Sequence, residues 1–161
     1  MSLLSRPETW AAKKGVSKMH GCYNAIGLWF IQGIAGILVD ASNHIFPLTI
    51  RAGVDAGDLT SASGSREALT GMATSSWSLS ATGFNHNMTI PANTVAQVLL
   101  PAASAADVRE AGKPVASVKG VTVSGAQMVN KINYVVLEVR SGEYTFTTSW
   151  TRTLEGTVRS G

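Results

Sequence analysis

FNHNMTI, residues 84–90, decides the fold class of this chain, because large side chains alternate in it with small polar ones. The large side chains fall on even positions, at Phe84, His86, Met88 and Ile90. A period of two is that of a half-buried β-strand, whose successive side chains point to opposite faces of a sheet. The stretch therefore predicts a strand with one face in a core.

Similar short runs follow, separated by residues that favour turns. Pro91-Ala92-Asn93 predicts a turn, and residues 94–100 predict another strand, which Pro101 ends. Residues 135–140 and 144–150 alternate in the same way around Ser141-Gly142, which predicts a hairpin. About eight such strands predict a mainly β fold, an antiparallel β-sandwich of the jelly-roll kind over residues 41–150.

A segment of different character precedes the strands. Residues 25–39, AIGLWFIQGIAGILV, are apolar apart from Gln32, and their large side chains recur at helical spacing. We expect one apolar, buried α-helix within residues 17–40, covered by the β-domain or by a partner. A bilayer span needs about 20 apolar residues, so no membrane span is predicted. Residues 1–16 are interpreted as an N-terminal extension and residues 151–161 as a loose tail.

The composition fits one folded domain. Hydrophobic residues make up 45% and charged residues 14% of the 161 residues, so burial can offset chain entropy. The net charge is +3, yet basic residues cluster only at Lys13, Lys14 and Lys18. A nucleic-acid site needs basic side chains gathered on one face, so no nucleic-acid partner is predicted.

The sequence lacks the residues that several kinds of chemistry require. Cys22 is the single cysteine, which rules out an internal disulfide and a cysteine zinc cage. The three histidines lack the spacing of metal ligands, and no nucleotide or serine-hydrolase motif occurs, so we expect no metal and no cofactor. The first residues lack a secretory pattern, and a cytoplasmic location is the default expectation.

Two sets of phrases are collinear over residues 8–148: Glu8-Thr9-Trp10 with the stretch from Ser17 to Ile37, and six short phrases from Ile45 to Phe146. In this order they resemble the C-terminal end of glycoside hydrolase family 78, the bacterial-type α-L-rhamnosidases. Glu8-Thr9-Trp10 and residues 17–37, SKMHGCYNAIGLWFIQGIAGI, are similar to the last helix of that family's (α/α)6 catalytic barrel. The other phrases are similar to its closing β-sandwich. They are residues 45–50 (IFPLTI), 57–62 (GDLTSA), 75–77 (SSW), 89–94 (TIPANT), 112–114 (GKP) and 139–146 (VRSGEYTF).

The resemblance implies that the chain is not an enzyme on its own. Members of the family hold their catalytic acids earlier in the barrel, in segments that have no counterpart here. Inverting hydrolysis needs two carboxyl groups about 6.5–9.5 Å apart across a sugar pocket. The ten acidic residues of this chain are dispersed, with no spacing that predicts such a pair.

Three residues are candidates for carbohydrate contact. The resemblance implies that His20 corresponds to the histidine that opens the last barrel helix, lines the sugar subsite and hydrogen-bonds the substrate. Trp10 and Tyr134 are predicted to be exposed rings on which a sugar could stack. The other aromatic residues are expected in the core.

Together these observations predict a non-catalytic structural or accessory module with weak affinity for carbohydrate, such as a rhamnose-containing glycan. One alternative is a chain that completes an α-L-rhamnosidase site by docking onto a separate catalytic barrel and contributing His20. Another is a protein-interaction module that self-associates through the apolar helix.

Overall fold

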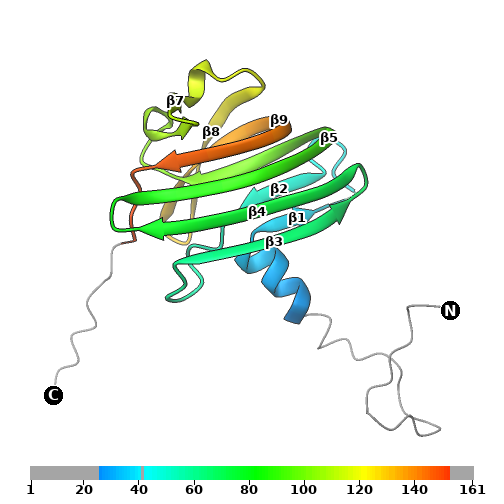
Figure 1. Ribbon diagram of the computed structural model, residues 1–161, viewed down its shortest axis with the longest axis horizontal. Helices are drawn as coiled ribbons and strands as arrows, with labels where there is room; N and C mark the ends of the chain where they lie inside the picture. Colours follow the sequence, from blue (N-terminus) through cyan, green and yellow to red (C-terminus); the bar gives the residue numbers. More distant parts are fainter. Residues whose placement is uncertain (1–25, 41, 153–161) are drawn as a thin grey trace, which may run out of the picture.

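The computed structural model describes residues 26–40 and 42–152. A short helical segment, α-helical at residues 26–29 and continuing as the π-helical turn η1 (Phe30–Ile34), leads into nine strands (Figure 1). The strands are β1 (Ile37–Val39), β2 (Leu48–Arg51), β3 (Ser61–Ala68), β4 (Gly71–Ser80), β5 (Gly83–Pro101), β6 (Arg109–Glu110), β7 (Lys113–Pro114), β8 (Val121–Val129) and β9 (Ile132–Thr148). Two short 3₁₀ turns, η2 (Ala105–Asp107) and η3 (Val115–Ser117), lie between β5 and β8.

Two long strands, β5 and β9, build both layers of the domain. The first half of β5 pairs with β4 and with the last residues of β9, and β3 extends this layer at its edge. The second half of β5 pairs with β2, while the first half of β9 pairs with β8, and β1 lies beside β2. In Figure 1 the β3–β4 layer stands in front of β1, β2 and β8. The predicted mainly β, sandwich-like fold is confirmed.

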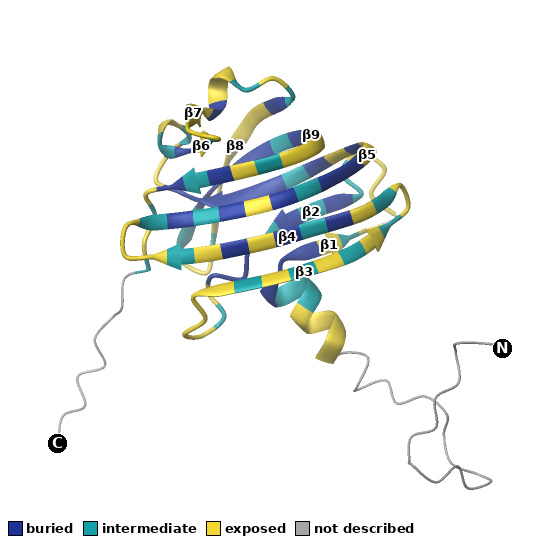
Figure 2. Ribbon diagram, viewed as in Figure 1, coloured by how far each residue is buried: buried dark blue, intermediate teal, exposed yellow. Residues whose placement is uncertain are grey.

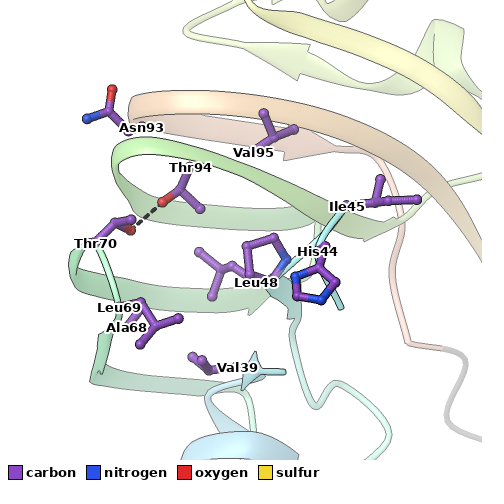
Figure 3. Close-up of a pocket in the computed structure, with 11 residues that line it drawn as sticks. Val39, His44, Ile45, Leu48, Ala68, Leu69, Thr70, Asn93, Thr94 and Val95 are labelled. Carbon is purple, nitrogen blue, oxygen red and sulfur yellow. Dashed lines mark hydrogen bonds between the residues drawn. The ribbon is translucent and has the colours of Figure 1, made fainter. Parts of the chain in front are cut away.

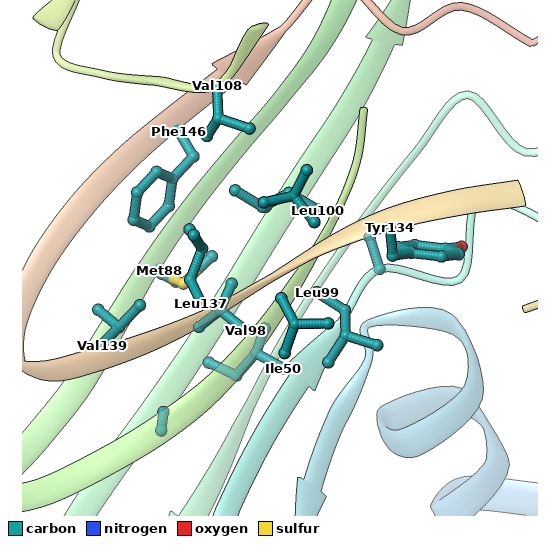
Figure 4. Close-up of a cluster of buried hydrophobic side chains, with 14 of the residues drawn as sticks. Ile50, Met88, Val98, Leu99, Leu100, Val108, Tyr134, Leu137, Val139 and Phe146 are labelled. Carbon is teal, nitrogen blue, oxygen red and sulfur yellow. The ribbon is translucent and has the colours of Figure 1, made fainter. Parts of the chain in front are cut away.

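The core lies between these layers. The even-numbered side chains of residues 84–90 all point inward, as their alternation predicts, and face residues such as Ile50, Val98 and Leu137 from the other layer. Figure 2 shows the resulting alternation of buried and exposed residues along β4 and β5, and Figure 4 shows the cluster itself. Period-two patterning therefore identified the inward face correctly.

Two predicted turns are bends instead. Residues 91–93 lie inside β5, and Ser141-Gly142 lies inside β9, so neither reverses the chain. Both bends fall at the same place, because Ile90 pairs with Gly142 and the register then shifts before Val95. Asn93, at φ 56°, and Gly142, at φ 152°, supply the backbone angles that the bend needs. The predicted hairpin across Ser141-Gly142 is therefore wrong: one strand bends from one layer into the other.

One strand pair departs from the antiparallel expectation. β2 runs parallel to β5, with Leu48 opposite Ala96 and Arg51 opposite Leu99. The chain crosses to the other layer after β2, makes the β3–β4 hairpin there, and returns within β5. This crossover brings β5 beside β2 in the same direction, so the sheet is mixed.

The helix predicted within residues 17–40 differs in extent and burial. Its first part lies outside the described residues, the helical segment ends at Ile34, and Ile37–Val39 form β1. Gly36, at φ 81°, separates the two elements. No helix in the described part of the chain is long and apolar enough to cross a bilayer.

Candidate functional site

The helical segment exposes apolar side chains where burial was predicted. Ile26, Leu28, Trp29 and Phe30 are 54%, 44%, 55% and 55% exposed, and we call these four residues the apolar turn. The rings of Trp29 and Phe30 meet edge to face, with centroids 5.2 Å apart. Figure 2 shows this segment projecting from the sandwich as an exposed element. The apolar turn is a preformed surface of aromatic and aliphatic groups.

Two buried side chains of β4 hold the end of this segment on the sandwich. Trp77 Nε1 donates a 2.8 Å hydrogen bond to the carbonyl oxygen of Ile34. Ser75 Oγ donates a 2.6 Å hydrogen bond to the carbonyl oxygen of Ala35. The last carbonyls of a helix have no partner within the helix, so these bonds satisfy groups that would otherwise be buried without one.

Glycines allow the close approach that these bonds require. A Cβ atom on Gly53 would lie 2.1 Å from the carbonyl oxygen of Gly33, and one on Gly36 would lie 1.9 Å from that of Arg51. Neither distance is possible for a real side chain, so both positions need glycine. Hydrogen bonds and backbone contact therefore hold the end of the helical segment, residues 33–36, on the sandwich.

Ser75 and His86 form a buried hydrogen-bonded pair, which has a structural role and does not have the polarity of a catalytic pair. Ser75 Oγ lies 2.8 Å from His86 Nε2. Because the serine proton is donated to Ala35, the bond to His86 needs the proton on Nε2, and the imidazole cannot accept the proton of Ser75. Burial lowers the pKa of His86 to about 3. An activated serine nucleophile requires the opposite polarity.

A groove runs along the outward face of the second layer. It measures about 420 Å³, and we call it the amide groove. Its lining residues are Gln32, Gly36, Leu38, Thr49, Arg51, Gln97, Leu99, Gln127 and Val129.

Tyr134 projects from this same face but is fully buried, with Arg51 over its ring, so its predicted exposure is wrong. The Arg51 guanidinium carbon lies 5.8 Å from the centroid of the Tyr134 ring, which is a cation–π contact. Burial raises the pKa of the Tyr134 phenol to about 12, and the positive charge of Arg51 opposes the rise. The ring therefore supports Arg51 and offers no face for a sugar to stack on.

A smaller cavity of about 230 Å³ opens between the β3–β4 turn and the chain before β2 (Figure 3). Its walls are mostly aliphatic, with Leu48 inside and the exposed Ile45 and Leu69 near the mouth. The hydroxyls of two of its eleven lining residues, Thr70 and Thr94, form a hydrogen bond with each other. Besides these hydroxyls, the polar side chains of the lining are His44 and Asn93.

The other two predicted sugar contacts, His20 and Trp10, lie outside the described residues. Sequence reasoning missed the residues of the amide groove, because glutamines on separate strands leave no motif. A signal was present in Gln97, a polar residue inside the apolar run VAQVLL at 95–100. Period two alone places its side chain on the outward face of that strand.

The acidic residues form no cluster of metal-binding type in the described part of the chain, where no group of three or more His, Cys, Asp or Glu comes together. Asp55 accepts a 2.6 Å hydrogen bond from Asn130 Nδ2 and lies 3.9 Å from Arg51 Nη1. Glu143 is exposed on β9, where it lines a groove of about 380 Å³ together with Glu110, and Glu138 is partly exposed on the same strand. These contacts are those of surface carboxylates.

Comparison with known proteins agrees with the sequence resemblance. Residues 48–114 match the family model of the bacterial alpha-L-rhamnosidase C-terminal domain. None of the curated proteins matches the chain. The predicted resemblance is confirmed by the family match and by solved structures.

Two solved structures share the fold. The α-L-rhamnosidase of Streptomyces avermitilis, complexed with L-rhamnose, is 27% identical with a TM-score of 0.62, over 83% of this chain and 12% of that one. The α-L-rhamnosidase of Dictyoglumus thermophilum is 22% identical with a TM-score of 0.61, over 86% of this chain and 15% of that one. The chain thus spans less than a sixth of the length of either enzyme.

Proposed function

From the similarity of this chain to the C-terminal domain of α-L-rhamnosidases, we propose that it is a non-catalytic accessory domain that packs onto a larger catalytic domain through the apolar turn. The occupant of that surface is an apolar patch of the catalytic domain. The great length of the matched enzymes outside this domain supports that choice.

The apolar turn carries the proposal. Its four large side chains are about half exposed, whereas the end of the same segment is tied to β4 by buried hydrogen bonds. Fully burying one such side chain is worth about 1.5–3 kcal/mol, so covering the cluster would stabilise a complex appreciably. An exposed apolar surface of this kind is typical of an interface.

Hydrolysis of an aryl α-L-rhamnoside tests the catalytic part of the proposal. The purified chain should release no aryl alcohol above the buffer rate, because it spans only 12% and 15% of the length of the two matched enzymes. Glu110 and Glu143 line one groove of about 380 Å³, so any turnover should be tested again in Glu110→Gln/Glu143→Gln. Turnover by the chain alone would overturn the proposal. Turnover that appears only with a separate catalytic barrel, and is lost in His20→Ala, would instead show that this chain completes the enzyme's site.

Binding to a separately expressed α-L-rhamnosidase barrel tests the docking part. We expect Trp29→Asp to weaken the complex by at least about tenfold, which corresponds to about 1.4 kcal/mol. Leu69→Asp is the matched control, since Leu69 is 83% exposed at the β3–β4 turn, and it should bind like the wild type. Self-association of the chain that Trp29→Asp abolishes, without binding to the barrel, would show that the surface belongs to an oligomer.

Weak affinity for carbohydrate belongs to the same proposal. The residues predicted for it give no support in the described structure, because Tyr134 is buried. Support comes from the amide groove, where polar groups from several elements converge.

A further inference from the structure

We propose that the amide groove binds a neutral saccharide. This inference deepens the proposed carbohydrate affinity by naming its site and ligand class, and it is independent of docking through the apolar turn. The strand register places the side chains that line this groove on one face of the sheet.

The register brings polar residues of separate strands into neighbouring rows. Thr49 of β2 pairs with Gln97 of β5, and Arg51 pairs with Leu99. Gln127 of β8 pairs with Tyr134 of β9, which in turn pairs with Pro101 of β5. Directly paired residues project from the same face of a sheet, so these side chains share the face opposite the core.

The groove offers hydrogen-bonding groups of both kinds. Gln32, Gln97 and Gln127 each carry two N–H donors and one carbonyl acceptor, and Thr49 adds a hydroxyl that can donate and accept. A polyol likewise presents groups that both donate and accept. A ligand rich in hydroxyls therefore fits this set better than one that only donates or only accepts.

Two buried polar atoms near the groove lack a partner among the described residues. They are Arg51 Nη1 and the hydroxyl of Tyr134. The nearest carboxylate, Asp55, lies 3.9 Å from Arg51 Nη1, beyond hydrogen-bond distance, and already accepts a bond from Asn130. Both atoms are shielded from solvent, and a hydrogen bond from the Arg51 side chain is one of the influences that lower the pKa of the Tyr134 phenol. A ligand can therefore reach only the rest of the Arg51 side chain, which is 31% exposed and would favour an oxygen acceptor.

The charge and shape of the groove further limit the class of ligand that it can bind. Arg51 is the one charged residue of the lining, and Asp55 beside it offsets its charge, so an anionic ligand gains little. Leu38, Leu99 and Val129 provide apolar wall, which suits the C–H face of a sugar ring. Pockets for drug-sized ligands measure about 300–1,000 Å³, and a groove of about 420 Å³ therefore holds one or two sugar rings.

The cavity of Figure 3 is the weaker candidate. It is smaller, mainly aliphatic, and its two threonine hydroxyls already bond to each other. His44 and Asn93 are its other polar side chains, so the cavity offers a sugar fewer hydrogen-bonding partners than the amide groove, with its three glutamines, Thr49 and Arg51.

Titration of the isotope-labelled chain with methyl α-L-rhamnopyranoside and methyl β-D-galactopyranoside, followed by amide chemical shifts, tests the proposal. We expect saturable shifts with a Kd of about 1 mM for at least one sugar, concentrated at Thr49, Gln97 and Gln127. Sodium acetate and sodium glucuronate test the anion alternative. Docking is measured separately, through the Trp29→Asp variant, so either proposal can fail without the other.

The variant Gln97→Ala/Gln127→Ala should bind at least about tenfold more weakly than the wild type, because two direct hydrogen bonds are lost. The matched control is Asn87→Ala, an exposed amide of the same strand β5 in the other layer, and it should leave the affinity unchanged. Thermal melting confirms that both variants fold.

Three outcomes would overturn the inference. The first is the absence of saturable shifts with either sugar. The second is saturable binding that maps to another surface or survives in the double variant. The third is equal response to acetate, which would identify Arg51 as an unspecific anion site.

Discussion

The indole Nε1 of Trp77 lies 2.8 Å from the carbonyl oxygen of Ile34, so a buried side chain of β4 closes a helical segment 43 residues earlier in the chain. Ser75, two residues before Trp77 on the same inward face, does the same for Ala35. The sandwich thereby sets the direction in which the apolar turn points. This relationship leads to the first prediction.

Trp77→Phe should lower the free energy of unfolding by about 1–3 kcal/mol, because the carbonyl of Ile34 loses its buried donor. Urea denaturation followed by circular dichroism measures the change. Trp150→Phe, which alters a partly buried ring at the edge of the same core, is the control and should cost less. Equal losses in the two variants would show that ring volume, and not the hydrogen bond, accounts for the effect.

Stability should fall as the pH drops below 7, because His86 is neutral when folded, with a pKa of about 3, and titrates near 6.5 when unfolded. Between these values the unfolded chain binds the extra proton, so acid favours unfolding. The expected loss from pH 7 to pH 5 is about 2 kcal/mol. Urea denaturation at each pH measures it.

The variant His86→Gln should remove most of this pH dependence, whatever its effect on stability at neutral pH. His44→Gln is the control, since His44 is exposed, and it should keep the dependence. A dependence in His86→Gln as steep as in the wild type would contradict the assignment.

Gly53→Ala should destabilise the chain by about 1–3 kcal/mol, because the new methyl group overlaps the carbonyl of Gly33 and forces the helical end away from β2. Gly27→Ala is the control: no atom lies within 4 Å of its added Cβ, and alanine favours helix. Thermal melting of both variants decides the matter. A wild-type melting temperature for Gly53→Ala would mean that the helical end is not held against β2.

Asn93→Val should cost about 1–2 kcal/mol, because a β-branched residue resists the left-handed angle, φ 56°, at the bend of β5. Asn93→Gly, which accepts that angle freely, should be close to neutral. Unfolding in urea compares the two. Similar stability of the valine and glycine variants would argue against a strained bend at this position.

The local alternation of large and polar side chains was enough to predict the sandwich. Particular residues show which features it could not predict. Residues 84–90 gave the inward face correctly, because a half-buried strand leaves a period of two in any sequence. Pro91 and Gly142 were interpreted as turns, since the same residues serve a turn and a bend. Only the pairing of Ile90 with Gly142, between positions distant in the sequence, distinguishes the two.

The site was harder to predict than the fold. Tyr134 was predicted to be exposed, yet Arg51, from a strand more than eighty residues earlier, lies over its ring. Trp29 and Phe30 looked buried because they are apolar, although they lie on a projecting turn. In each case the exposure of the side chain depends on which distant segments pack against it, and no single stretch of sequence contains that information.

The two strands that pass through both layers make the domain indivisible. A break in the chain at the bend of β5 would leave each layer without half of its central pair, so neither part would retain a complete sheet. Proteolysis or truncation there should give fragments that fold only when recombined, and any natural rearrangement of this module has to move it whole.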